Sequence, residues 1–136
     1  YKILFGLLIL IWSSDSWAFV CGKLFGRHKL FEIISPNKTW EGFIGSVILT
    51  TLTAYILSLN EFELSSVEWM ILGALTAFIA TLGDLFQSML KRESNIKDSG
   101  NILPGHGGIL DRFDSILFCF PLFYLYLHYI NPFLNY

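Results

Sequence analysis

Apolar residues are concentrated in four long runs, which polar segments separate. The runs extend from about Lys2 to Gly22, Glu41 to Leu59, Val67 to Leu90 and Gly108 to Ile130. About 20 apolar residues in a helix suffice to cross a hydrocarbon layer of about 30 Å. The pattern therefore predicts an all-α fold, a polytopic transmembrane helix bundle with four spans in this chain.

The composition supports a membrane protein. Of the 136 residues, 54% are hydrophobic and only 15% are charged, whereas soluble domains have about 25% charged residues. The net charge of -2 gives no reason to expect a nucleic-acid partner. The chain opens at Tyr1 inside an apolar run and without a methionine. We therefore expect residues 1–136 to form a single integral-membrane domain that is the C-terminal half of a larger bundle.

Charged residues lie on two sides of the predicted membrane. The loops 22–40 and 91–107 contain most of the lysines and arginines, whereas the loop 60–66 contains Glu61 and Glu63 and no basic residue. Cytoplasmic loops are enriched in lysine and arginine. The two basic loops are therefore predicted to face the cytoplasm, at a cell inner membrane or an endomembrane, and to contact anionic membrane lipids.

Ionisable residues are dense between Ser88 and Asp114, next to two apolar runs. Such groups beside a membrane span are costly unless they are paired or hydrated. Their number points to chemistry rather than to lipid contact. They are Lys91, Arg92, Lys97, Asp98, His106, Asp111, Arg112 and Asp114.

Four aspartates, Asp15, Asp84, Asp111 and Asp114, fall near the cytoplasmic ends of three predicted spans. Carboxylates that converge in a partly dry place repel one another unless they are protonated or share a cation. Oxygen ligands without companion cysteines are typical of Mg²⁺ sites. Because the adjacent bases suit phosphate oxygens, the pattern indicates phosphoryl or nucleotidyl transfer.

The segment Ile34–Gly42 contains a second candidate phosphate site. Ser35 followed by Pro36 is a favourable N-cap and first-turn pair, so a helix is predicted to begin here. Lys38 and Thr39 would then lie on its first turn, where free N–H groups and positive partial charge favour phosphate. An amphipathic connector whose lysines bind lipid head groups explains the same residues equally well.

Gly107 and Gly108 follow His106 just before the fourth apolar run. Glycines let backbone N–H groups approach an anion closely, as in phosphate-binding loops. A phosphate monoester is largely ionised at neutral pH, so a reaction in which it is the nucleophile needs no general base. We therefore interpret His106 as a hydrogen-bond donor or a residue that shapes the turn.

Three other interpretations remain open on these residues alone. Ser88 and Lys91 have the spacing of a serine–lysine nucleophile pair, although the companion motifs of such enzymes are missing. Arg112 could form structural ion pairs with Asp111 or Asp114. The carboxylates could also line an ion pathway.

The segment from Ser88 to Asp114 resembles the signature of the phosphatidate cytidylyltransferases, also called CDP-diacylglycerol synthases. It has the order Ser-Met-Leu-Lys-Arg, four residues, Lys-Asp-Ser-Gly, two residues and Leu-Pro-Gly-His-Gly-Gly-Ile-Leu-Asp-Arg-Phe-Asp. The upstream stretches Asp15–Gly22 and Ile34–Gly42 are also similar to that family. Phe19 departs from it, because the family frequently has tyrosine there.

The resemblance implies an integral membrane enzyme that condenses CTP with phosphatidic acid to CDP-diacylglycerol and pyrophosphate. It also implies Mg²⁺, a second cation for which monovalent K⁺ is a candidate, and a homodimer. Members of the family are longer than this chain, with more spans on the N-terminal side.

Carried over residue by residue, the resemblance makes Asp84 and Asp111 metal ligands, with Asp15 as a further metal candidate. The other members of the implied catalytic site fall into three groups. Lys91, Arg92, Lys97 and Arg112 would hold phosphate oxygens; Ser35, Lys38, Thr39, Ser88, Gly107 and Gly108 would form the nucleotide or phosphate seat; Asp98, His106 and Asp114 would have further roles.

Two rival functions remain at this level. A CTP-dependent polyprenol or phytol kinase would transfer the γ-phosphoryl group to a lipid alcohol and release CDP instead of pyrophosphate. A cation transporter is the alternative outside enzymes, but it has no use for so many basic residues beside the carboxylates.

Overall fold

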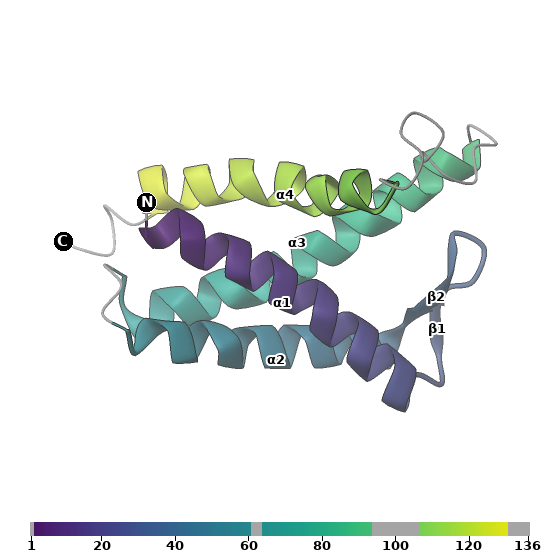
Figure 1. Cartoon of the computed structure of the whole chain (residues 1–136), viewed down its shortest axis with the longest axis horizontal. Coiled ribbons are helices and arrows are strands. Elements are labelled where there is room, and N and C mark those ends of the chain that lie inside the picture. The colour runs from purple at the N-terminus through teal and green to yellow at the C-terminus, as the bar shows by residue number, and fades with distance from the viewer. Residues whose placement is uncertain (1, 61–63, 94–106, 131–136) are drawn as a thin grey trace.

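The computed structural model of the chain describes residues 2–60, 64–93 and 107–130, with the backbone alone for 107–114 and 130. Four long helices pack side by side in an elongated bundle, and a β-hairpin lies across one end of it (Figure 1). The elements are α1 (Lys2–Phe25), β1 (Lys29–Phe31), β2 (Ser35–Thr39), α2 (Trp40–Ser58), α3 (Ser66–Glu93), α4 (Gly107–Leu125) and a π-helical turn, η2 (Tyr126–Ile130).

The predicted membrane-spanning bundle is confirmed. In the described part of the chain, α1, α2 and α3 are long and apolar enough to cross a membrane. The fourth predicted span is α4 together with η2, and its apolar part runs from Ser115 to Tyr129. Pro121 lies inside α4, which membrane helices tolerate because neighbouring backbone groups adjust locally.

The predicted helix start at Ser35 is wrong, because Ser35–Thr39 is strand β2. This strand pairs antiparallel with β1, and Lys29 lies opposite Thr39. Pro36 is compatible with the pairing because both strands of a two-stranded hairpin are edge strands, where a missing N–H costs little. Among the described residues, this hairpin is the one β element, and the expected all-α fold did not include it.

Helix α2 begins at Trp40, and Thr39 is its N-cap. The Thr39 side-chain oxygen accepts a hydrogen bond of 3.1 Å from the Gly42 N–H. Ser35 and Thr39 are both favourable N-cap residues. Because Ser35 is paired in the hairpin, the helix begins after Thr39 instead. Lys38 therefore lies on a strand, not on the first turn of a helix.

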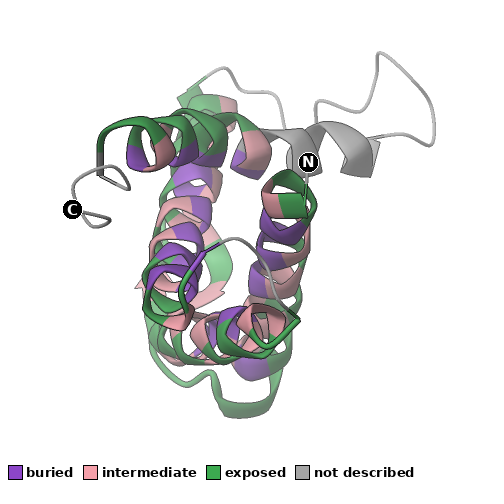
Figure 2. Ribbon diagram, turned by 90° about the vertical axis from the view of Figure 1, so that its left-hand side faces the viewer, coloured by how far each residue is buried: buried purple, intermediate pink, exposed green. Residues whose placement is uncertain are grey.

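The buried core lies between the helices, with its largest side chain on α3. Trp69 is fully buried and packs on Gly6 of α1, where any Cβ would collide with the indole ring. Leu10 and Leu72 are also fully buried. Figure 2 shows buried residues facing the interior of the bundle and exposed residues facing outward. Many of the outward side chains are large and apolar, as lipid contact requires.

Helices α1 and α2 approach closely near the hairpin. A Cβ on Gly42 would lie 3.0 Å from both Gly22 Cα and the Ala18 carbonyl oxygen. Small residues at such crossings let helix backbones approach closely in membranes. The contact fixes the start of α2, and with it Lys38 and Thr39, against the last turns of α1.

Candidate functional site

A cavity of about 240 Å³ lies where α1, the hairpin, α2 and α3 meet. It brings together four of the predicted site residues, Asp15, Lys38, Thr39 and Asp84, from three separate segments of the chain. The lining residues are Ser14, Asp15, Ala18 and Phe19 from α1, Leu30, Asn37, Lys38 and Thr39 from the hairpin, Gly42 and Phe43 from α2, and Thr81 and Asp84 from α3.

Lys38 and Asp84 form an ion pair at this cavity. The distance between Lys38 Nζ and Asp84 Oδ2 is 3.0 Å. The Nζ atom is buried, although 25% of the side chain is exposed. An ammonium group has three N–H donors. Because Nζ has no hydrogen-bond partner beyond this ion pair among the described residues, it keeps donors for a ligand.

The second oxygen of Asp84 is bound by a residue of α4. Ser115 Oγ of α4 donates a hydrogen bond of 3.2 Å to Asp84 Oδ1. Ser115 is fully buried, whereas 32% of the Asp84 side chain is exposed. The carboxylate is therefore fixed between the hairpin and α4, with part of its surface open to the cavity.

Asp15 lines the same cavity from α1 and is half-buried. With Asp84 it supplies oxygen ligands of the kind that Mg²⁺ prefers.

The two carboxylates fit a Mg²⁺ site with few protein ligands. No cluster of three His, Cys, Asp or Glu side chains occurs within the described ranges. Mg²⁺ is commonly bound by only one or two protein carboxylates, together with waters and substrate phosphates. Asp15 and Asp84 match that donor set, but a metal at Asp84 would meet the Lys38 ammonium already in place.

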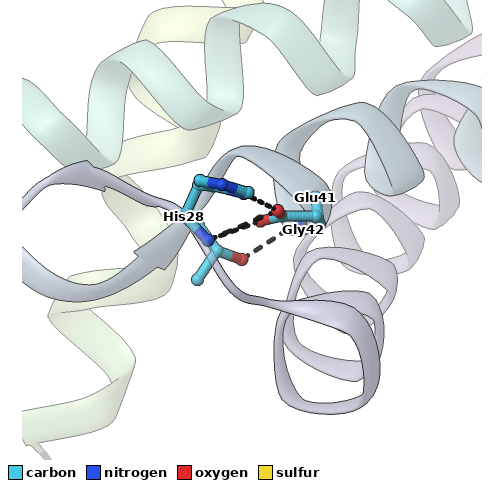
Figure 3. A network of polar contacts seen from close by, with 4 residues as sticks. His28, Glu41 and Gly42 are labelled. Atoms are coloured by element: carbon cyan, nitrogen blue, oxygen red, sulfur yellow. Dashed lines mark hydrogen bonds and ion pairs between the residues drawn. The ribbon is translucent and has the colours of Figure 1, made fainter.

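His28 and Glu41 attach the hairpin to the first turn of α2. The Glu41 carboxylate accepts hydrogen bonds of 3.2 and 3.3 Å from the His28 backbone N–H, and its Oε1 lies 2.6 Å from His28 Nδ1 (Figure 3). The Trp40 N–H donates to the His28 carbonyl oxygen at 3.0 Å. These contacts fix the base of the hairpin whose second strand carries Lys38.

The same contacts change the expected phosphate seat. Of the first N–H groups of α2, that of Trp40 is bonded to His28 and that of Gly42 to Thr39. Two of the N–H groups expected to form the seat thus already have partners, whereas the Lys38 side chain lines the cavity. Ser35 lies at the other end of β2 and does not line the cavity.

Ser88, Lys91 and Arg92 lie on the last turns of α3, beyond Asp84. Ser88 and Lys91 are half-buried like Asp84, whereas Arg92 is exposed. None of these three lines the cavity. Their part in binding phosphate stays a prediction.

The remaining predicted site residues have no described side chains. Helix α4 begins at Gly107, next to the predicted start at Gly108. The residues outside the described ranges are Lys97, Asp98 and His106, and those with backbone alone are Gly107, Gly108, Asp111, Arg112 and Asp114.

Three polar residues reach the site although they were not predicted to belong to it. Thr81 precedes Asp84 by one helical turn, and Ser115 follows Asp111 by one turn. Helical spacing from a predicted carboxylate could have found both. Ser14, which is buried beside Asp15, carries no such signal, because adjacent helical residues point in different directions.

The chain is similar to known enzymes over nearly its whole length. The model of the cytidylyltransferase family matches residues 1–130. The phosphatidate cytidylyltransferase of Bacillus subtilis (strain 168) is 46% identical over 125 residues, which are 91% of this chain and 46% of that protein. Proteins of the same name from Staphylococcus saprophyticus and Staphylococcus aureus (strain COL) are 44% and 46% identical, over 90% of this chain and 47% of each relative.

The chain thus spans about half the length of the curated relatives it matches. The matched region contains all the elements described above, from α1 to η2. The chain belongs to the cytidylyltransferase family.

Proposed function

We propose that this chain supplies the catalytic half of a phosphatidate cytidylyltransferase, which condenses CTP with phosphatidic acid to CDP-diacylglycerol and pyrophosphate. The ion pair between Lys38 and Asp84 carries the proposal. It places a cation with spare N–H donors and a partly exposed carboxylate at one cavity of a membrane bundle. A site that holds phosphate together with a divalent cation needs both groups.

In the proposed reaction a phosphate oxygen of phosphatidate attacks the α-phosphorus of CTP. The bond between that phosphorus and the oxygen that bridges to the β-phosphate breaks, and pyrophosphate leaves with the bonding electrons. The attacking phosphate is largely ionised at neutral pH, so no side chain has to remove a proton. The protein positions the two phosphates and offsets their negative charge.

Asp84 and Asp15 would hold Mg²⁺, with Asp111 of α4 as the third carboxylate. Bound Mg²⁺ supplies positive charge at the phosphate oxygens. Ser115 keeps the Asp84 carboxylate oriented, and Lys38 binds phosphate oxygens. A second, monovalent cation such as K⁺ belongs to the proposal on the family resemblance alone.

The size of the cavity limits what it can hold. Its volume of about 240 Å³ is below the roughly 300–1,000 Å³ of typical ligand sites. We therefore assign it to the reacting phosphates and the metal. The cytosine, the ribose and the acyl chains would use surfaces beyond it, including the last turns of α3 with Lys91 and Arg92.

We assign this end of the bundle to the cytoplasmic side of the membrane. Exposed basic residues gather at the hairpin end, on the last turn of α1 and on the hairpin, and the basic last turn of α3 lies at the same end (Figure 1). By the positive-inside rule such residues remain in the cytoplasm. CTP is a cytoplasmic metabolite, so it would reach the site from that side.

The full-length protein in lipid nanodiscs, supplied with Mg²⁺, CTP and phosphatidate, tests the proposal. We expect CDP-diacylglycerol and pyrophosphate in equal amounts, and no turnover in Asp84→Asn. Release of CDP with a phosphorylated lipid alcohol would instead identify a kinase. Cation flux without nucleotide turnover would identify a transporter.

A further inference from the structure

We propose that Lys38 is an exchangeable counter-ion: it neutralises Asp84 while the metal is absent, and metal binding moves its ammonium group from Asp84 to the phosphates. The inference rests on the proposed function, because it requires a divalent-cation site at Asp84. It gives Lys38 two successive partners rather than one.

Both oxygens of Asp84 already have partners. Oδ2 lies 3.0 Å from Lys38 Nζ, and Oδ1 accepts a hydrogen bond of 3.2 Å from Ser115 Oγ. A carboxylate oxygen has lone pairs for more than one partner, so the neutral hydroxyl can stay when a metal arrives. The ammonium cannot stay in place as readily, because it carries the same sign of charge as the metal.

The distances make this conflict direct. Mg²⁺ binds carboxylate oxygens at about 2.0–2.1 Å. A metal on the cavity side of Asp84 would therefore come within a few ångströms of the Lys38 ammonium. In a partly buried site the repulsion between the two cations is weakly screened. Metal binding must either displace the ammonium or lose affinity.

The hairpin lets the side chain move while its backbone stays fixed. Strand β2 is paired with β1, Thr39 caps α2, and the His28–Glu41 contacts attach the hairpin base to α2. The four-carbon stem of lysine is flexible, so the ammonium can relocate by rotation of its own bonds. Nζ is buried at the cavity and keeps N–H donors for acceptors of a ligand.

The exchange links metal binding to nucleotide binding. Without metal, Lys38 neutralises the charge of Asp84 at the cavity. With metal at Asp84, the released ammonium adds a second positive charge for the phosphates. Each ligand therefore favours the other, and thermodynamic linkage makes the effect reciprocal.

Binding of Mn²⁺ alone to the full-length protein in detergent, measured by electron paramagnetic resonance, tests the first half of the exchange. Lys38→Met removes the competing charge, and we expect Mn²⁺ to bind at least about fivefold tighter, the lower end of typical coupling between sites. Lys38→Arg keeps the charge and should bind Mn²⁺ like the wild type. Lys29→Met is the matched control, because Lys29 lies on the same hairpin but pairs with Glu32.

Binding of CTP at saturating Mg²⁺ tests the second half. We expect Lys38→Met to weaken CTP binding at least about fivefold, while Lys29→Met leaves it unchanged. Unaltered Mn²⁺ affinity in Lys38→Met, or an equal gain in Lys29→Met, would overturn the counter-ion role. Tighter Mn²⁺ binding with unaltered CTP binding would overturn the transfer to phosphate.

The premise has its own control. Asp84→Asn should abolish Mn²⁺ binding. If Mn²⁺ still binds, the proposed metal site at Asp84 is wrong, and so is the exchange that depends on it. If Lys38→Met does not fold, judged by circular dichroism, Lys38→Gln replaces it with the same expected outcomes. A neutral amide neither repels Mn²⁺ nor neutralises Asp84.

Discussion

Ser115 of α4 donates a hydrogen bond of 3.2 Å to Asp84 of α3. This contact joins α3 and α4 at the candidate site and involves the Asp84 oxygen that does not pair with Lys38. Ser115 is fully buried, so water cannot replace it as a donor without a cavity being opened. The orientation of the proposed metal ligand thus depends on the docking of α4.

Ser115→Ala is expected to lower activity by about 10- to 100-fold, the usual cost of losing a partner that orients a metal ligand. The protein should remain folded, because the change removes one hydroxyl. Turnover and Mn²⁺ affinity are the measurements. Ser46→Ala is the matched control, since Ser46 is equally buried but bonds the Phe43 carbonyl of its own helix. Equal losses in both variants would contradict a specific role of Ser115.

Asp111→Asn is expected to abolish turnover while far-ultraviolet circular dichroism stays unchanged. The reason is that an amide cannot supply the negative charge that the proposed metal site needs. Glu93→Gln, at the exposed end of α3, should retain full activity. Activity retained in Asp111→Asn would remove Asp111 from the proposed metal site.

Glu41→Gln is expected to loosen the hairpin, because the carboxylate binds both the ring and the backbone N–H of His28. Hydrogen exchange should become faster in residues 28–39, and the KM for CTP should rise, with little change in Tm. Glu32→Gln breaks the exposed Lys29–Glu32 pair on the same hairpin and should change neither. A lower Tm with unchanged exchange would show that Glu41 stabilises the bundle rather than the hairpin.

Gly42→Ala and Gly22→Ala should differ in stability although the two glycines face each other. A methyl group on Gly42 would lie 3.0 Å from three neighbours, whereas one on Gly22 would have its nearest neighbours at 3.3 and 3.9 Å. We expect Gly42→Ala to cost about 1–3 kcal/mol of unfolding free energy, as overpacking does, and Gly22→Ala clearly less. Reversible unfolding in mixed detergent measures both, and the opposite order would disprove this account of the crossing.

The helices could be predicted because their signal is local and long. Each apolar run is close in length to what a membrane requires, and the observed α2 and α3 bounds lie within a few residues of the predicted ones. The hairpin could not be predicted in the same way. Ser35 and Thr39 give nearly equal N-cap signals, and the choice depends on pairing with Lys29–Phe31, which a local pattern does not show.

The types of residue at the candidate site could be predicted from the sequence, but the contacts between them could not. The aspartates stand out because charge is costly beside apolar runs, and Asp15 and Asp84 do line one cavity with Lys38. The contact of Lys38 with Asp84, however, depends on how β2 and α3, which are far apart in the sequence, are brought together by the fold. Spacing along the chain therefore suggested a phosphate seat at a helix end, where the structure has a lysine side chain on a strand.

The order of the segments along the chain has a consequence for biogenesis. Lys38 is synthesised before the second span, and Asp84 near the end of the third. An unpaired carboxylate at the edge of the bilayer is costly. The ion pair with Lys38 offsets that cost once α3 lies beside the hairpin, so it stabilises the position of α3 in the bundle.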